Sequence, residues 1–306
     1  MISLTKSLQE YLSIRRALGF KLQEYDTVIK SFLAFLHQEK AKTITTKLAL
    51  RWAVLPENVQ PAHWARRLSM VRGFAEYRSA TDPMTEVPSK TALPHMYHRA
   101  QPYIYSSREI IQLVAAAKNL PSVMGLRPLT YSTLFGLLAV TGMRMSESIH
   151  LDQKDIDLDD GVLLIRQSKF RKSRIIPIRS STQRQLQRYA CERDRLCPIQ
   201  TSQSFFISDS GRRLTNCMVR WTFIRLSWKI GLRQSTDSNG PRLHDLRHRF
   251  AVQTLLNWYR SGVDVERHLP ELSTYLGHVK VTDTYWYLTA VPELLQLAAK
   301  RLDQNN

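Results

Sequence analysis

The sequence has few of the features that mark several large classes of protein. It holds only three cysteines among 306 residues, Cys191, Cys197 and Cys217, and no C-x-x-C pair. A disulfide scaffold is therefore excluded, and free thiols in a reducing cytosol are expected. No apolar run approaches the roughly 20 residues of a membrane span, since the longest, 133–141, is about half that length. The first 12 residues also lack the apolar stretch of a signal peptide. We therefore expect a cytoplasmic protein that does not contact membranes.

Repeats and low-complexity segments are absent as well, so solenoid and fibrous architectures are not expected. Hydrophobic residues make up 43% of the chain and charged residues 23%, which is enough apolar material for one or two buried cores and argues against a disordered chain. A length of 306 residues corresponds to about two domains of ordinary size.

Positive charge is abundant. The chain carries 44 Lys and Arg against 26 Asp and Glu, a formal net charge of +18. Such an excess indicates a polyanionic partner, most often nucleic acid, because neutralising phosphates releases condensed counterions. A basic ribosome-associated or membrane-surface protein would have a similar composition. The excess is spread over both halves of the sequence and is not confined to a basic tail.

Residues 1–80 predict a small helical domain. Apolar residues recur at helical spacing in four segments, the last of which runs from about 61 to 79. The other faces of that helix carry Arg66, Arg67 and Arg72, which are candidates for DNA contacts. Residues 81–103 contain four prolines and predict a linker between domains.

Residues 104–306 predict a mixed but mostly helical domain. Two strands, 161–167 and 173–179, flank a basic turn at 168–172. The expected helices run from Ser106 or Ser107 to Lys118 and over 129–140, 181–195, 215–230, 243–260, 264–276 and 292–302. The fold class is mainly α with a small β-hairpin or sheet.

Four short segments of this second domain combine phosphate-binding and proton-transfer groups. They are T-G-M-R-M-S-E (141–147), the basic turn with Lys169, H-D-L-R-H (244–248), and L-G-H (276–278) followed by Tyr287 nine residues after His278. Their order and spacing resemble those of the tyrosine site-specific recombinases, the family of phage integrases and Xer proteins. The resemblance covers about 102–306, and residues 1–80 match the family's helical DNA-binding domain in size and type.

The resemblance implies an enzyme that cleaves and rejoins DNA strands through a 3′-phosphotyrosyl intermediate, with no cofactor, metal or ATP. Tyr287 would be the nucleophile, Arg144 and Arg247 would hold the non-bridging phosphate oxygens, and Lys169 would protonate the leaving 5′-oxygen. The full set of implied catalytic residues is Arg144, Lys169, His244, Arg247, His278 and Tyr287. Glu147 and His248 are expected to support the site.

Some assignments stay open at the level of sequence. Lys172 competes with Lys169 as general acid, because this turn lacks the glycine frequent in the family, and Arg171 adds a third cation. Arg171 and Lys172 are also candidates for DNA contacts. Tyr275 and Tyr285 compete with Tyr287, although residues 285 and 287 lie about 200° apart on a helix and so cannot face one phosphate together.

A metal site is a weaker alternative. His244 and His248 are spaced i, i+4 like a zinc pair, but no third ligand is evident nearby. We expect His248 to satisfy packing of its own helix or to contact the backbone of the active site.

The resemblance also implies partners. These are double-stranded recombination sites held in a C-shaped clamp, further copies of the chain as a homotetramer in the synaptic complex (a monomer or dimer otherwise), and accessory proteins. It also implies that the enzyme recombines the DNA of a mobile element and associates with the bacterial nucleoid. The helix at 292–302 would dock into a neighbouring protomer, or alternatively pack on its own domain. A type IB topoisomerase and a non-catalytic DNA-binding accessory protein are the rival functions.

Overall fold

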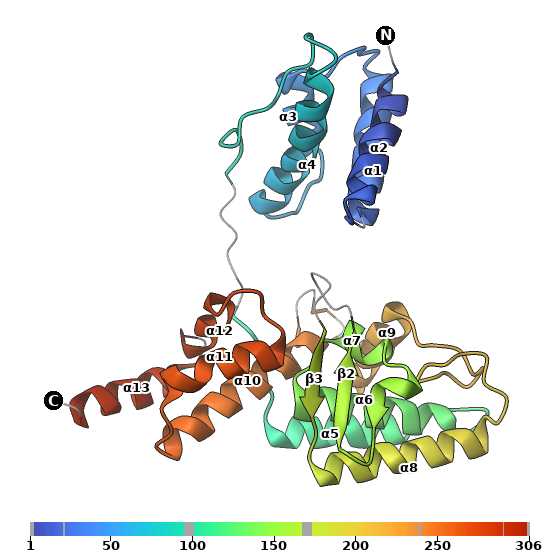
Figure 1. The fold of residues 1–306 in the computed structure, drawn as a ribbon, viewed down its shortest axis with the longest axis vertical. Helices are drawn as coiled ribbons and strands as arrows, with labels where there is room; N and C mark the ends of the chain where they lie inside the picture. The colour runs from blue at the N-terminus through green and yellow to red at the C-terminus, as the bar shows by residue number, and fades with distance from the viewer. Residues whose placement is uncertain are drawn as a thin grey trace. The chain divides into compact units, whose positions relative to one another are not determined.

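The computed structural model describes residues 3–20, 22–94, 101–166, 173–234, 236–237, 240–289 and 291–304. The chain divides into two compact units, residues 1–100 and residues 101–306 (Figure 1). The mainly helical fold with one small sheet confirms the fold class predicted from the sequence.

Within its described residues, the first unit contains four helices at the positions that the hydrophobic spacing predicts. They are α1 (Leu4–Ala17), α2 (Gln23–Gln38), α3 (Thr46–Val54) and α4 (Pro61–Ser79). Each helix contributes fully buried side chains to one core, for example Leu8, Phe32, Trp52 and Phe74. The core forms because one apolar face of each helix is removed from water.

Part of the proline-containing segment 81–103 is attached to this first unit. Asp82 is buried and pairs with Arg78 at 3.5 Å. The backbone N of Glu86 donates to the carbonyl of Ile44 at 2.8 Å, and Leu93 packs against the core. The prolines disfavour a helix here, and the segment instead forms polar and apolar contacts with the rest of the first unit. Residues 82–93, which lie within the segment predicted as a linker, thus pack on the first unit.

The first part of the second unit contains the sheet and the helices that precede and follow it in the chain. These helices are α5 (Ser107–Lys118), α6 (Leu126–Thr141), the short α7 (Met145–Ile149), α8 (Ser180–Leu196) and α9 (Asn216–Lys229). The side chain of Ser106 caps α5 and forms a capping box with Glu109. Helix α6 is buried along most of its length, as its apolar sequence predicts.

The sheet is antiparallel, in the order β1-β2-β3, among the described residues. Its members are β1 (Ile156–Asp157), which follows the 3₁₀ turn η1 (Gln153–Asp155), β2 (Val162–Ile165) and β3 (Arg174–Pro177). Leu163 pairs with Ile176 across β2 and β3, and both side chains are buried. The hairpin prediction is confirmed, and β1 is an addition that the sequence did not indicate.

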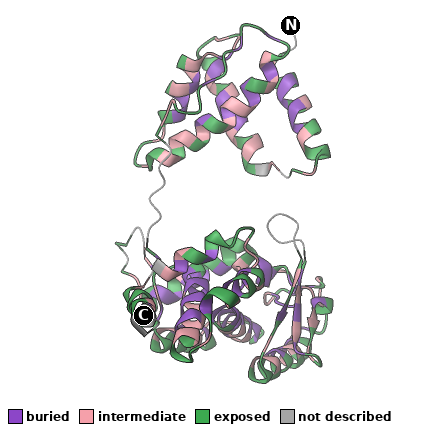
Figure 2. Cartoon of the chain, turned by 60° about the vertical axis from the view of Figure 1, so that its left-hand side comes forward, coloured by how far each residue is buried: buried purple, intermediate pink, exposed green. Residues whose placement is uncertain are grey.

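The last helices of the second unit form a second core, whose buried residues are among those coloured purple in Figure 2. These helices are α10 (Leu243–Arg260), α11 (Val265–Leu276), α12 (Thr282–Tyr285), η3 (Trp286–Thr289) and α13 (Pro292–Gln304). Helix α10 takes part in two cores of this unit. Leu246 belongs to the core that the sheet forms with the preceding helices, which includes Leu163 of β2, and Leu255 belongs to the second core. The residues near the start of α10 therefore lie where the two cores meet.

Helix α13 packs on α10 of its own chain. Leu294 is 1% exposed within the second core, and Glu293 pairs with Arg260 of α10 at 2.5 Å. Of the two arrangements expected for this helix, the single chain shows packing on its own domain.

Candidate active site

A tight turn at the end of α6 brings Arg144 to the site. Gly142 has a φ of +61°, and a Cβ atom there would lie 2.6 Å from Cδ1 of Phe250, so only glycine fits. Arg144 is the N-cap residue of α7, and its backbone N donates to Oε2 of Glu147 at 2.9 Å. The T-G-M-R-M-S-E segment is thus a helix end, a left-handed glycine and a helix start.

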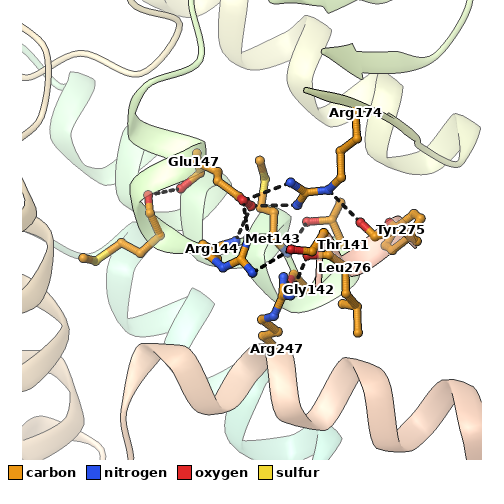
Figure 3. A network of polar contacts seen from close by, with 12 residues as sticks. Thr141, Gly142, Met143, Arg144, Glu147, Arg174, Arg247, Tyr275 and Leu276 are labelled. Atoms are coloured by element: carbon orange, nitrogen blue, oxygen red, sulfur yellow. Dashed lines mark hydrogen bonds and ion pairs between the residues drawn. The ribbon is translucent and has the colours of Figure 1, made fainter. Parts of the chain in front are cut away.

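The Glu147 carboxylate lies between two guanidinium groups (Figure 3). Its Oε1 accepts from Nη1 of Arg144 at 2.7 Å and from Nη1 of Arg174 at 2.9 Å, and its Oε2 accepts from Nη2 of Arg174 at 2.8 Å. Burial alone would raise the pKa of Glu147, but the hydrogen bonds and charge of Arg174, with further help from Arg144, lower it to about 2. Glu147 is therefore ionised, and its expected supporting role fits this position.

Arg247 projects from α10 and is almost completely buried. Its Nη1 donates to the carbonyl of Gly142 at 3.0 Å and its Nη2 to the carbonyl of Leu276 at 2.5 Å. Burial, followed by the charge of Arg144, lowers the pKa of Arg247 to about 10, so the side chain still carries its charge at neutral pH. The buried guanidinium ties the turn after α6 to the end of α11.

The C-terminal end of α11 presents carbonyl groups to this cluster of arginines. Gly277 ends the helix with a φ of +69°. Three successive carbonyls each accept one side-chain bond: Tyr275 from Arg174 (2.7 Å), Leu276 from Arg247 (2.5 Å) and Gly277 from Arg144 (3.0 Å). A helix end leaves such carbonyls without helical partners and carries partial negative charge, so guanidinium groups suit it.

His278 follows this turn directly. Its Nδ1 lies 2.7 Å from Oγ1 of the buried Thr284, which fixes the orientation of the ring. The ring stacks on that of Tyr287, with centroids 6.0 Å apart and an interplanar angle of 22°. The L-G-H segment and the expected nucleophile are therefore neighbours in the structure.

Tyr287 is the tyrosine that the structure places among the expected catalytic groups. It is 1% exposed, its ring lies 5.4 Å from that of His248, and its hydroxyl is close enough to Arg247 to influence the pKa of that arginine. Tyr285 is 49% exposed, so the two side chains do face different directions. The ring of Tyr275 stacks on Phe250 at 5.4 Å.

His244 lies one helical turn before Arg247 and keeps an exposed surface. Desolvation by the surrounding protein, followed by the positive charge of Arg247, lowers the pKa of His244 to about 4, so the ring is neutral at pH 7. His248 is buried, and its ring meets that of His244 at 90° with centroids 4.8 Å apart. This edge-to-face contact, together with contacts to Trp286 and Tyr287, fits the expected supporting role of His248. Among the residues that the structure describes, no group of three or more His, Cys, Asp or Glu side chains is arranged to hold a metal ion.

The cationic turn of the hairpin lies outside the described residues. Lys169, Arg171 and Lys172 all fall within 167–172, so the choice between the two lysines as general acid stays a prediction. The strands on either side are described, and β3 starts at Arg174, directly beside Glu147.

The three arginines expected to contact DNA from the first unit differ in their surroundings. Arg66 is mostly exposed and pairs with Glu24 at 2.6 Å. The guanidinium of Arg67 lies 3.7 Å from the ring centroid of Trp52 and donates to its carbonyl at 3.0 Å. Arg72 donates to Oγ of Ser69 at 3.0 Å. All three arginines thus have contacts within the unit, and their binding to DNA stays a prediction.

Arg174 is the site residue that sequence reasoning missed. The spacing of the hairpin places it in a strand, but its partners Glu147 and Tyr275 are 27 and 101 residues away in the chain. The signal available in the sequence was a charged residue at the start of a strand with apolar neighbours, which indicates a polar partner but does not identify it.

In the part of the chain that the structure describes, no helix combines the length and apolar character needed to cross a bilayer.

The chain is similar to known proteins in both sequence and structure. The sequence pattern of the phage integrase family matches residues 105–293. "Putative integrase/recombinase y4rB" of Sinorhizobium fredii (strain NBRC 101917 / NGR234) is 48% identical over 308 residues, which cover 99% of this chain and 98% of that protein. The structure is similar to that of XerH site-specific recombinase bound to palindromic difH substrate in a post-cleavage complex, with a TM-score of 0.69, 19% identity, and coverage of 99% of this chain and 86% of that chain. It is also similar to a lambda integrase tetramer bound to a Holliday junction, with a TM-score of 0.63, 20% identity, and coverage of 94% and 77%.

The match over more than half of the chain and the 48% identical relative place this protein in a family: the chain belongs to the phage integrase family. It is a site-specific recombinase, an enzyme that transfers DNA strands.

Proposed function

We propose that this recombinase cleaves DNA with Tyr287 as nucleophile, forms a 3′-phosphotyrosyl intermediate, and rejoins the strand to a new partner. The observation that carries the proposal is the convergence of Tyr287, His278 and Arg247 around the end of α11. A tyrosine hydroxyl is a weak nucleophile at neutral pH, so it needs a cationic site that stabilises the charge of the transition state.

Arg144 and Arg247 would bind the non-bridging oxygens of the scissile phosphate. Both guanidinium groups are held by backbone carbonyls before any substrate binds, so they need little reorganisation during the reaction. His278 and the neutral His244 would donate further hydrogen bonds to the phosphate. Because Tyr287 is 1% exposed, its attack on DNA requires the η3 segment to shift and expose the hydroxyl.

The general acid would come from the hairpin turn. Lys169 is the first candidate for protonating the 5′-oxygen and Lys172 the second, while Arg171 and Lys172 would also contact DNA. The position of β3 beside Glu147 supports this assignment, because it brings the base of the hairpin to Arg144.

The partners would be double-stranded recombination sites and further copies of the chain. Structures with the same fold include XerH on its difH substrate and a lambda integrase tetramer on a Holliday junction, which supports a tetramer in the synaptic complex. Residues 1–80 would be the helical DNA-binding domain, 81–103 the linker and 104–306 the catalytic domain, with accessory proteins as further partners. The site of action would be the cytoplasm, at the nucleoid, and the DNA moved would belong to a mobile element.

A suicide duplex tests the proposal. It is built from the repeats that flank the gene and nicked beside the crossover point, so that the covalent intermediate is trapped. The expected result is a covalent adduct that depends on Tyr287, forms only on these sites, and persists in excess EDTA. An adduct on almost any duplex would indicate a topoisomerase, and DNA binding without an adduct would indicate an accessory protein.

A further inference from the structure

Arg174 occupies a position that no part of the proposed chemistry yet uses. Its side chain is 9% exposed, although it projects from a strand next to the hairpin turn. Nη1 and Nη2 bind the two oxygens of Glu147, and Nε binds the carbonyl of Tyr275. These three bonds fix the orientation of the planar guanidinium group, and a lysine side chain could not make the same set of bonds.

The two-pronged contact between Arg174 and Glu147 limits how the Arg144 side chain can bind the same carboxylate. A carboxylate accepts a guanidinium most favourably through two parallel bonds. Oε1 accepts from Arg174 and, at 2.7 Å, from Nη1 of Arg144, whereas Oε2 accepts from Arg174 and from the backbone N of Arg144. Each oxygen thus already has two donors, and the other terminal nitrogen of Arg144 reaches Gly277. Without Arg174, Glu147 would draw Arg144 into a two-pronged pair and away from a phosphate.

Arg174 also packs against the turn that carries His278. A Cβ atom on Gly277 would lie 2.8 Å from Nη1 of Arg174, so the guanidinium rests directly on the glycine backbone. The carbonyls of this turn hold Arg247 and Arg144 in addition. One side chain therefore joins the start of β3, the Glu147 carboxylate and the turn at Gly277.

We propose that Arg174 is a positioning residue of the recombinase: it holds Arg144 in its phosphate-binding orientation through Glu147. This inference rests on the proposed function, because it assigns Arg174 a role in the Tyr287 reaction. Arg174 itself contacts neither the phosphate nor the nucleophile in this scheme.

Single-turnover cleavage of the suicide duplex, with enzyme in excess, tests this role in the full-length protein. Arg174→Lys keeps the charge but loses the two-pronged pair, so cleavage should slow by on the order of 10–100-fold, the scale for losing an outer hydrogen-bonding partner. Affinity for the uncut site should change little, whereas loss of the bonds to the Tyr275 carbonyl and to one Glu147 oxygen should lower the melting temperature, so cleavage is measured well below it. Arg184→Lys, on the exposed face of α8, is the matched control and should cleave at the wild-type rate.

A double-mutant cycle separates positioning from a general structural role. If Arg174 acts through Arg144, Arg174→Lys should cause no further loss of cleavage rate in an Arg144→Ala background. The positioning role would be overturned if Arg174→Lys lowers the cleavage rate by the same factor in the wild type and in Arg144→Ala. It would also be overturned if Arg174→Lys alone cleaves at the wild-type rate. Tyr287-dependent cleavage would stand in either case. A wild-type enzyme whose adduct does not depend on Tyr287 would overturn the proposed function, and the role of Arg174 with it.

Discussion

Arg144 and Arg247 donate to successive carbonyl groups of one helix end, Arg247 to Leu276 at 2.5 Å and Arg144 to Gly277 at 3.0 Å. The two guanidinium groups come from different helices and repel each other, although burial lowers the pKa of Arg247 more than the charge of Arg144 does. The partial negative charge of the helix end and the ionised Glu147 offset this repulsion. Two cations are thereby fixed side by side, which is the arrangement that a phosphate diester needs.

Replacement of Tyr287 by Phe should abolish the covalent adduct on the suicide duplex, because it removes the phenolic hydroxyl placed near His248, His278 and Arg247. Binding to the uncut site should stay close to wild type. Tyr285→Phe is the matched control, since its side chain is exposed and faces elsewhere. Denaturing gels of the trapped complex provide the measurement. An adduct that persists in Tyr287→Phe and disappears in Tyr285→Phe would transfer the nucleophile to residue 285.

Arg144→Ala and Arg247→Ala should each lower the single-turnover cleavage rate by on the order of 10²–10³-fold, the scale for losing one preorganised donor to the transition state. The two variants should differ in stability. Loss of the buried Arg247 leaves the carbonyls of Gly142 and Leu276 without this donor, at about 1–3 kcal/mol for each carbonyl that stays unsatisfied. Arg144 is more exposed, so its loss should cost less. Urea unfolding of both variants checks this order, and equal destabilisation would contradict it.

The general acid can be identified through the leaving group. A 5′-bridging phosphorothiolate departs as a thiolate, which needs no proton, so this substrate should restore cleavage by Lys169→Ala if Lys169 is the acid. It should not restore cleavage by Arg144→Ala, whose defect is in binding the non-bridging oxygens. Rescue of Lys172→Ala in place of Lys169→Ala would assign the acid to the second lysine.

Much of the fold was predictable because it depends on local patterns. The hydrophobic spacing of α4 and α10, the ends of α6 and α11 near residues 140 and 276, and the paired strands around the basic turn all follow from residues close together in sequence. The opposite facing of Tyr285 and Tyr287 was likewise a matter of helical geometry and is confirmed by their exposure.

What the sequence could not provide are partners that lie far apart along the chain. Nothing local marks Arg174 as the residue that binds Glu147 and the carbonyl of Tyr275. The attachment of residues 82–93 to the first core was also unpredictable, because proline content excludes a helix but does not determine what a segment packs against.

Acid should destabilise the protein through two groups that act at different pH. The folded state holds the pKa of His244 at about 4, below its ordinary 6.5, so the unfolded state binds the proton first and stability falls as the pH drops from 6.5 to 4. Glu147 has a folded pKa of about 2 against an ordinary 4.5, so its ion pairs stabilise above pH 4.5 and are lost as the pH falls towards 2. The second effect amounts to at most about 3 kcal/mol.

Urea unfolding between pH 7 and 3 is the measurement. In His244→Gln the free energy of unfolding should fall less between pH 6.5 and 4, and in Glu147→Gln it should fall less below pH 4.5. An unchanged acid response in Glu147→Gln would contradict the assignment of the lower pH range to Glu147.

Helix α13 provides a prediction about assembly, based on two adjacent leucines. Leu294 is 1% exposed in the core with α10, whereas Leu295 is 51% exposed. Leu294→Ala should lower the free energy of unfolding by about 2–5 kcal/mol, the range for a large-to-small change in a core. Because the helix packs on its own chain, this loss should not depend on protein concentration. Leu295→Ala should change the stability by no more than about 0.5 kcal/mol and serves as the matched control. Urea unfolding at two protein concentrations a hundredfold apart is the measurement. A stability that rises with concentration in the wild type and not in Leu294→Ala would instead show that the helix docks into a neighbouring protomer.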